Sequence, residues 1–205
     1  MNEELCESVL SFLAGAEMAA LRFGRDAGLA CPTGCGDCCR DDRPGDSVLA
    51  ALPAAAWAIG EDLVDLLAAA VKEPSGVCVF YDGDAAKHCR VYPLRPLVCR
   101  LFGFAGRHDK YGNIDFRPCR RMKGAAESPG SAVPPVFSDL ALQLEGFYPP
   151  LGRERRPLNI AFHEAAQWLL LRKQYSTVGS KPGTRPLRIG RAAPPQSSLR
   201  RKALS

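Results

Sequence analysis

Apolar residues recur at helical spacing in four stretches of the chain. The first covers residues 2–26, and its apolar positions fall at Leu5, Val9, Phe12, Ala16, Ala19 and Phe23. A second helix is expected over residues 53–72, because proline suits a first helical turn and Pro53 precedes a stripe of alanine, isoleucine and leucine. Residues 137–147 and 157–169 predict two further helices, each with apolar residues on one face.

The middle of the chain changes from helical periodicity to short apolar runs between turn residues. Residues 77–81 and 88–92 are predicted to be short strands around the polar turn 82–84. Residues 102–116 predict another hairpin, and we find no internal repeat. The whole pattern predicts a single α+β domain over residues 1–175, mostly helical, with small β-hairpin elements around a cysteine-rich site.

Residues 176–205 have a different composition, rich in Pro, Gly, Ser and Arg, with seven basic and no acidic residues. Their low apolar content predicts a disordered basic tail. Subtracting these seven charges from the net charge of +5 leaves −2 for residues 1–175. Nucleic-acid binding is therefore disfavoured for the body, while the tail could contact nucleic acid or another acidic partner. No feature of the sequence identifies a protein partner.

The start of the chain has no basic segment followed by an apolar one, so we expect no signal peptide. No apolar run approaches the roughly 18–20 residues that a membrane span needs, so we expect no membrane partner. We therefore predict a cytoplasmic location, where thiols stay reduced.

Eight of the nine cysteines lie in segments expected to be loops, turns or short strands, and we predict that they are metal ligands: Cys31, Cys35, Cys38, Cys39, Cys78, Cys89, Cys99 and Cys119. The first four form a C-x3-C-x2-C-C cluster, whose close spacing lets thiolates converge on one ion. Gly34 and Gly36 let this backbone turn tightly. The ninth, Cys6, lies alone in the first predicted helix and is interpreted as a small buried apolar residue.

Disulfides and simple packing are the alternatives for these cysteines, and both are less favoured. Cys38 and Cys39 are adjacent, with Cα atoms about 3.8 Å apart, whereas disulfides usually need at least about 4.4 Å. Arginines that follow or lie near the cysteines could stabilise thiolates, or could pair with ordinary carboxylates: Arg40, Arg90, Arg95, Arg100, Arg120 and Arg121. Among the histidines, His88 could be an alternative ligand or hydrogen-bond to one, while His108 and His163 are weaker candidates.

Two sequence blocks resemble a known family. The segment CPTGCGDCC at residues 31–39, and the run CRVYPLRPLVCRLF at 89–102, are similar to the bacterial CxxCxxCC cysteine-cluster family, over roughly residues 25–120. The first gap has three residues here, where the family usually has two. The resemblance implies zinc or iron chelation, the latter including an iron–sulfur cluster, and implies no particular reaction.

Three classes of function remain open at this point. The metal could mainly hold the fold, either as two four-thiolate zinc sites or as one or two iron–sulfur clusters. An iron site could instead serve a redox or protein-modifying enzyme, since a related cysteine signature occurs in bacterial proteins linked to flagellin lysine methylation. A metal-supported binding module that uses the basic tail is the third. No G-x-G-x-x-G loop and no catalytic triad is present, so we predict no catalytic residues and no nucleotide-type cofactor.

Overall fold

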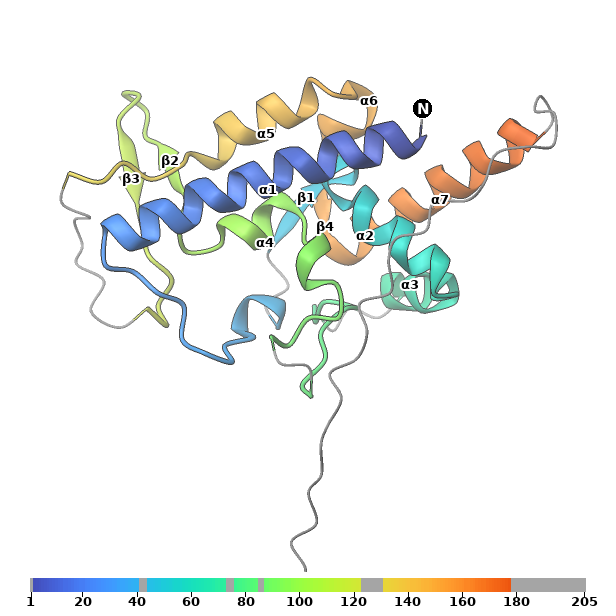
Figure 1. Ribbon diagram of the computed structural model, residues 1–205, viewed down its shortest axis with the longest axis horizontal. Helices are drawn as coiled ribbons and strands as arrows, with labels where there is room; N and C mark the ends of the chain where they lie inside the picture. The colour runs from blue at the N-terminus through green and yellow to red at the C-terminus, as the bar shows by residue number, and fades with distance from the viewer. Residues whose placement is uncertain (1, 41–43, 73–75, 85–86, 123–130, 178–205) are drawn as a thin grey trace, which may run out of the picture.

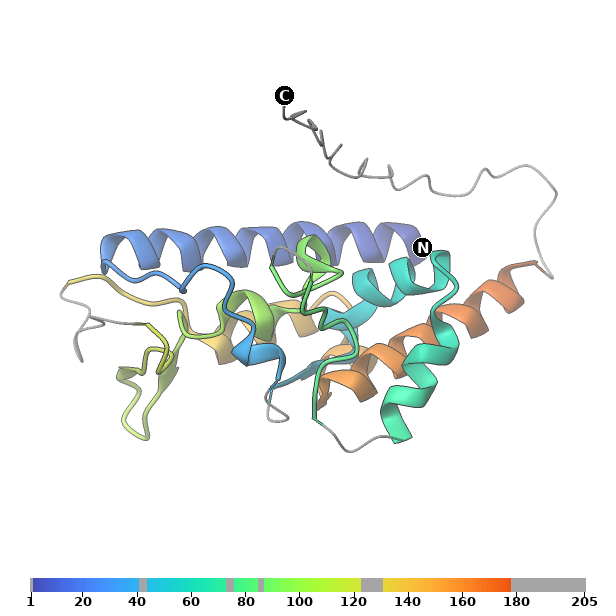
Figure 2. The same cartoon turned by 90° about the horizontal axis from the view of Figure 1, so that it is seen from below.

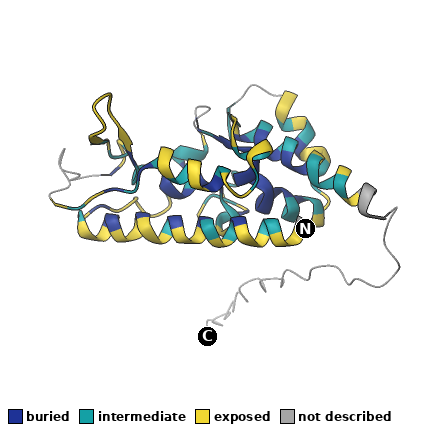
Figure 3. Cartoon of the chain, turned by 90° about the horizontal axis from the view of Figure 1, so that it is seen from above, coloured by how far each residue is buried: buried dark blue, intermediate teal, exposed yellow. Residues whose placement is uncertain are grey.

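The computed structural model describes residues 2–40, 44–72, 76–84, 87–122 and 131–177. Its longest element is helix α1 (Asn2–Asp26), which confirms the first predicted helix and runs along one side of the molecule (Figure 1). Its buried positions alternate by three and four residues: Val9, Leu13, Ala16, Ala20 and Phe23. Ala19, which we expected on this stripe, is exposed. The outward face of the helix is exposed along its length (Figure 3).

The second predicted helix was wrong in its limits, because two helices occupy this region. Helix α2 (Val48–Gly60) begins before Pro53, since the hydroxyl of Ser47 caps it by accepting a hydrogen bond from the backbone of Ala50 at 3.2 Å. It ends at Gly60, and two residues later the φ of 59° at Asp62 lets the backbone N–H of Leu63 donate to the carbonyl of Ala58. Helix α3 (Val64–Lys72) then continues in a new direction.

The core lies around α2, whose first eight residues, 48–55, are all buried. Helix α7 (Leu158–Thr177) packs against α2 and α3, while α1 packs against α2 on another side. Strand β1 (Gly45–Ser47) pairs antiparallel with β4 (Arg155–Pro157), which ties the start of α2 to the start of α7. Helices α5 (Phe137–Glu145) and α6 (Pro149–Gly152) complete this layer beside α1 (Figure 1).

The middle segment is less regular than predicted. The two expected strands at 77–81 and 88–92 reduce to a single antiparallel bridge between Tyr81 and Cys89. The backbone N–H of Cys78 bonds to Cys39 instead of a strand partner, and a 3-10 turn, η2 (Tyr92–Leu94), follows. Helix α4 (Leu97–Leu101) comes next, where no helix was expected. The predicted hairpin is confirmed by β2 (Gly106–His108) and β3 (Ile114–Phe116).

The fold is therefore a mostly helical α+β domain with small antiparallel strand pairs, as the sequence predicted. A second, smaller apolar cluster joins the end of α1 to the hairpin, through Phe23, Leu29, Phe116 and Met122. None of the helices in the described part of the chain is long and apolar enough to cross a membrane. Helix α7 continues to Thr177, past the expected domain limit at 175, and the rest of the predicted tail, 178–205, lies outside the described residues.

Candidate metal centre

The cysteine loop follows α1 and folds back across the middle segment of the chain. The first two cysteines, Cys31 and Cys35, lie on either side of a turn. The backbone N–H of Cys35 closes this turn by donating to the carbonyl of Pro32 at 3.1 Å. Gly34 permits this turn, because its φ of 70° is one that glycine adopts without strain. Cys38 and Cys39 follow on the 3-10 turn η1 (Asp37–Cys39). This tight 3-10 turn fixes the backbone of the two adjacent cysteines.

Backbone hydrogen bonds bring Cys78 to this loop. Its N–H donates to the carbonyl of Cys39 at 2.8 Å, so the two cysteines are fixed on neighbouring segments. Asn159, at the start of α7, binds the backbone on both sides of Cys78. Its amide donates to the carbonyl of Val77 and accepts from the N–H of Val79, both at 2.9 Å. The loop and this segment lie side by side in two views of the molecule (Figures 1 and 2).

Cys99 lies on α4, which is anchored by the buried carboxylate of Asp46. This carboxylate accepts the backbone N–H of Val98 at 2.7 Å and that of Ser47 at 2.8 Å, so one side chain joins α4 to β1. Burial raises the pKa of Asp46 to about 6, against the lowering effect of these hydrogen bonds. The position of Cys99 thus depends on a residue far away in the sequence.

Five cysteines, which we call the inner group, interact electrostatically across three segments: Cys38, Cys39, Cys78, Cys89 and Cys99. Burial, together with negative charge on the neighbouring sulfurs of Cys89 and Cys38, raises the pKa of Cys78 to about 12. Burial also raises the pKa values of Cys89 and Cys99. A hydrogen bond from Cys39 to the sulfur of Cys38 lowers the pKa of Cys38 to about 7 and raises that of Cys39.

The other three cysteines, Cys31, Cys35 and Cys119, form an outer group. Burial, followed by interaction with Cys35, raises the pKa of Cys31 to about 11, and the charges of Cys38 and Cys119 add to this effect. Cys119 packs with the small apolar cluster at the end of α1, not with the main core. Cys119 is far from the cysteine loop in the sequence, and the fold brings it near Cys31.

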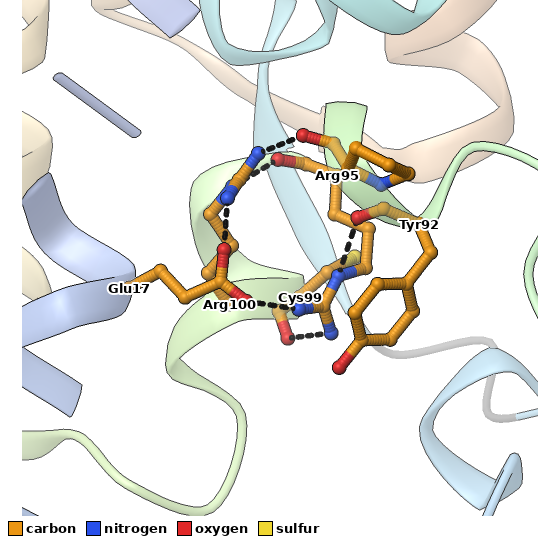
Figure 4. Close-up of polar contacts among 6 residues, drawn as sticks. Glu17, Tyr92, Arg95, Cys99 and Arg100 are labelled. Atoms are coloured by element: carbon orange, nitrogen blue, oxygen red, sulfur yellow. Dashed lines mark hydrogen bonds and ion pairs between the residues drawn. The ribbon is translucent and has the colours of Figure 1, made fainter. Parts of the chain in front are cut away.

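A buried ionic network lies beside Cys99 (Figure 4). The carboxylate of Glu17, from α1, accepts hydrogen bonds from Arg95 at 2.7 Å and from Arg100. Arg95 also donates to the carbonyls of Tyr92 at 3.0 Å and Cys99 at 3.5 Å. Its guanidinium stacks on the ring of Tyr92, 3.6 Å from the centroid. The Arg100 side chain, only 2% exposed, donates to the carbonyls of Arg95 and Pro93.

The arginines near the cysteines therefore divide between the two expected roles. Arg95 supplies positive charge to the inner group, because its guanidinium lowers the pKa values of Cys38, Cys89 and Cys99. Arg100 pairs with Glu17, Arg90 with Asp82 at 3.2 Å, and Arg121 with Asp37. The charges of Cys35 and Cys119 also act on Arg121, which places this arginine near the outer group.

Cys6 and two of the histidines have other surroundings. Burial raises the pKa of Cys6 to about 11, and this cysteine packs against the main core within α1. His108 lies in the hairpin, where its ring nitrogen is 3.0 Å from the carboxylate of Asp139. His163 is half-buried on α7. His88 differs from both, since it lies directly against the cysteine loop.

In the part of the chain that the structure describes, no three His, Cys, Asp or Glu side chains are already arranged to hold a metal ion. The chemistry of the donors nevertheless fits zinc or iron. All eight predicted ligands are free thiols, and soft thiolates suit both metals. Several of these thiols raise each other's pKa, and a bound cation relieves that repulsion. Binding would draw sulfurs on neighbouring segments together.

Comparison with known proteins gives one match. Residues 30–120 match the model of the CxxCxxCC family, described as "Putative zinc- or iron-chelating domain". No curated protein and no solved structure matches the chain. The matched region contains all eight predicted ligands and leaves out Cys6, as well as Glu17 of the ionic network. The extent expected from the sequence, roughly 25–120, agrees with this match.

Proposed function

Since the chain carries a domain of the CxxCxxCC family over residues 30–120, we propose that its function is to chelate zinc or iron through eight cysteines. The proposed ligands are Cys31, Cys35, Cys38, Cys39, Cys78, Cys89, Cys99 and Cys119. Because these cysteines come from four separate segments, a bound ion would cross-link parts of the chain that are far apart in the sequence. Metal binding at such sites contributes directly to the free energy of folding.

One observation carries this proposal. The thiol of Cys39 lies close enough to three others, Cys38, Cys78 and Cys99, for their negative charges to raise its pKa. These sulfurs come from the cysteine loop, the segment after α3 and helix α4. Thiols gathered in this way repel one another as thiolates, so a cation that binds them all is strongly favoured. Packing alone gives no reason for four thiols from three segments to meet.

The surroundings of the inner group favour thiolate ligands. The guanidinium of Arg95 places positive charge beside Cys38, Cys89 and Cys99, which offsets part of the negative charge of a thiolate-bound divalent ion. The segments that carry the sulfurs are held by the hydrogen bonds of Asn159 and Asp46. When bound, the metal would supply a cross-link and, in the case of iron, a redox-active centre.

Metal content measured on paired variants tests the proposal. Cys99→Ser should lower the amount of zinc or iron per chain, because it removes an inner ligand from α4. Cys6→Ser is the matched control, since Cys6 packs in α1 away from both groups, and its metal content should equal that of the natural chain. The proteins should be purified without oxygen, so that thiols remain reduced. Equal metal content in both variants would show that Cys99 is not a ligand.

An absorption spectrum of the same samples identifies the metal. Zinc(II) has a filled d shell and gives no visible absorption. Thiolate-bound iron gives charge-transfer bands, and an iron–sulfur cluster also releases sulfide in acid. Zinc would support a chelated ion with a structural role, whereas iron would favour the redox alternative that the resemblance to the family leaves open.

A further inference from the structure

His88 occupies an unusual position beside the cysteine loop. Its φ of 52° is in the left-handed region, which residues other than glycine rarely adopt. Among the described residues, its Nδ1 is the buried side-chain nitrogen or oxygen that has no hydrogen-bond partner. A buried polar atom without a partner destabilises the folded state, because it has given up its hydrogen bonds to water. A histidine held in this way suggests a role that an ordinary surface residue does not have.

The loop leaves room for this imidazole on both sides of Cys35. A Cβ added at Gly36 would lie 3.0 Å from the Cβ of His88 and 3.3 Å from its Cδ2. A Cβ added at Gly34 would lie 3.8 Å from its Nε2. Both neighbours of Cys35 are thus residues without a side chain, facing the same histidine. The ring of Tyr81, with its centroid 5.9 Å from that of His88, covers another side.

The outer group is short of one ligand. The ion pair of Arg121 with Asp37 ties the segment of Cys119 to the cysteine loop, and Cys31 interacts with Cys35, Cys38 and Cys119. The inner group already contains five thiols, more than a four-coordinate ion needs. The packing separates the groups as well. Cys119 lies with the apolar cluster of Phe23 and Met122, whereas Cys78, Cys89 and Cys99 pack against the main core.

We propose that His88 joins Cys31, Cys35 and Cys119 to form a second zinc site, separate from the inner group. Three thiolates and one imidazole are one of the usual ligand sets of four-coordinate structural zinc. The buried Nδ1 and the Nε2 that faces Gly34 are the two nitrogens available. A zinc ion bound at either one would explain why the imidazole lies against the cysteine loop. Arg121, which bonds to Asp37, supplies positive charge beside these thiolates. The inference rests on the proposed chelating function.

The site predicts a particular pattern of zinc loss. The full-length chain, reduced and loaded with zinc alone, should hold about two ions, one in each four-coordinate site. His88→Asn and Cys119→Ser should each lower this to about one ion, and the double variant should also hold about one, because both changes destroy the same site. Adding both Cys78→Ser and Cys99→Ser to His88→Asn leaves three inner thiols, so this variant should lose the second ion as well. Asparagine is chosen because it tolerates a positive φ.

X-ray absorption at the zinc edge gives a readout that loss of folding does not imitate. The natural chain should show nitrogen at about 2.0–2.1 Å besides sulfur at about 2.3 Å, and His88→Asn should show sulfur alone on the zinc that remains. The control is His108→Asn, since His108 lies in the hairpin beside Asp139, and its spectrum and zinc content should not change. Circular dichroism checks that each variant stays helical.

The outcomes separate this inference from the proposed function. Two zinc ions surrounded only by sulfur, with no change in His88→Asn, would overturn the second site and leave chelation by cysteines intact. Additive loss in the double variant would also overturn it, because His88 and Cys119 would then belong to different sites. A natural chain that binds no zinc under these conditions would reject both proposals.

Discussion

Replacing Glu17 by glutamine should destabilise the fold strongly, although this residue lies outside the region that matches the family. The change keeps the size of the side chain but removes its charge and one of its two acceptor oxygens. Each oxygen of Glu17 accepts a hydrogen bond from a different arginine, Arg95 or Arg100. The amide nitrogen of glutamine would face one of these guanidinium groups, so one buried cation would lose its partner.

The magnitude follows from the burial of this network. The side chain of Arg100 is 2% exposed and that of Arg95 is 15% exposed, while Glu17 keeps 24% of its side chain exposed. Removing one partner of a buried ion pair costs about 3–5 kcal/mol, and the partial exposure of Glu17 favours the lower end, about 3 kcal/mol. For a chain of this size each kcal/mol lowers Tm by about 2–4 °C, so the expected decrease is about 6–12 °C.

Thermal unfolding of the natural chain and Glu17→Gln, monitored by circular dichroism in the same buffer, measures this effect. Glu145→Gln is the matched control, because Glu145 binds Arg153 at 3.2 Å and the Arg153 side chain is 75% exposed. An ion pair with an exposed partner contributes about 0–1 kcal/mol, so the control should change Tm little. Similar small changes in both variants would refute the argument that the network stabilises α4 and Cys99.

Three other predictions concern the cysteine groups and their supports. Gly103→Ala should destabilise the fold by about 1–3 kcal/mol, because Gly103 has a φ of 80° and an added Cβ would lie 2.8 Å from the Cβ of Cys119. Gly15→Ala, in an open part of α1, should instead stabilise by about 0.5–1 kcal/mol, and urea unfolding compares the two. Zinc affinity, measured by competition with a chelator, should fall in Gly103→Ala and not in Gly15→Ala; unchanged affinity in both would argue against Cys119 as a ligand. The folded-state pKa of Asp46, about 6, is above its ordinary value, so the folded state binds more protons between about pH 4 and 6. Stability of the natural chain relative to Asp46→Asn should therefore fall as pH rises from about 4 to about 6, and a flat difference would contradict the burial of an ionisable carboxyl. Asn159→Ala should cost about 1–3 kcal/mol by leaving the backbone groups of Val77 and Val79 without partners, and hydrogen exchange at Val79 should accelerate; unchanged protection there would rule out this anchor.

The parts of the fold that the sequence predicted well are those set by local patterns. The stripe that contains Val9 and Phe23 defined α1, and the apolar residues of α5 and α7 defined those helices in the same way. The break between α2 and α3 was missed, because Asp62 provides the left-handed residue there and the usual signal is glycine. Ser47, which precedes an apolar run, is a helix-cap signal that the prediction based on Pro53 did not use.

The parts that could not be predicted depend on contacts between distant segments. Strands β1 and β4 are three residues each and pair across more than half of the chain, so neither has a periodic signal of its own. Glu17 is one of many polar residues on α1, and only the packing of α1 on α4 shows that it pairs with Arg95 and Arg100. The division of the cysteines into two groups likewise depends on contacts between distant segments. The packing of the hairpin at the end of α1 brings Cys119 near Cys31, although the two are far apart in sequence.

The most direct test of the central claim is X-ray absorption at the metal edge of the natural chain, purified without oxygen and without added metal. The edge energy identifies zinc or iron, and the distances identify the atoms bound to it. Our account predicts that sulfur is the main neighbour, at about 2.3 Å for zinc. A metal surrounded only by oxygen and nitrogen, or a chain that carries no metal, would contradict chelation by the eight cysteines.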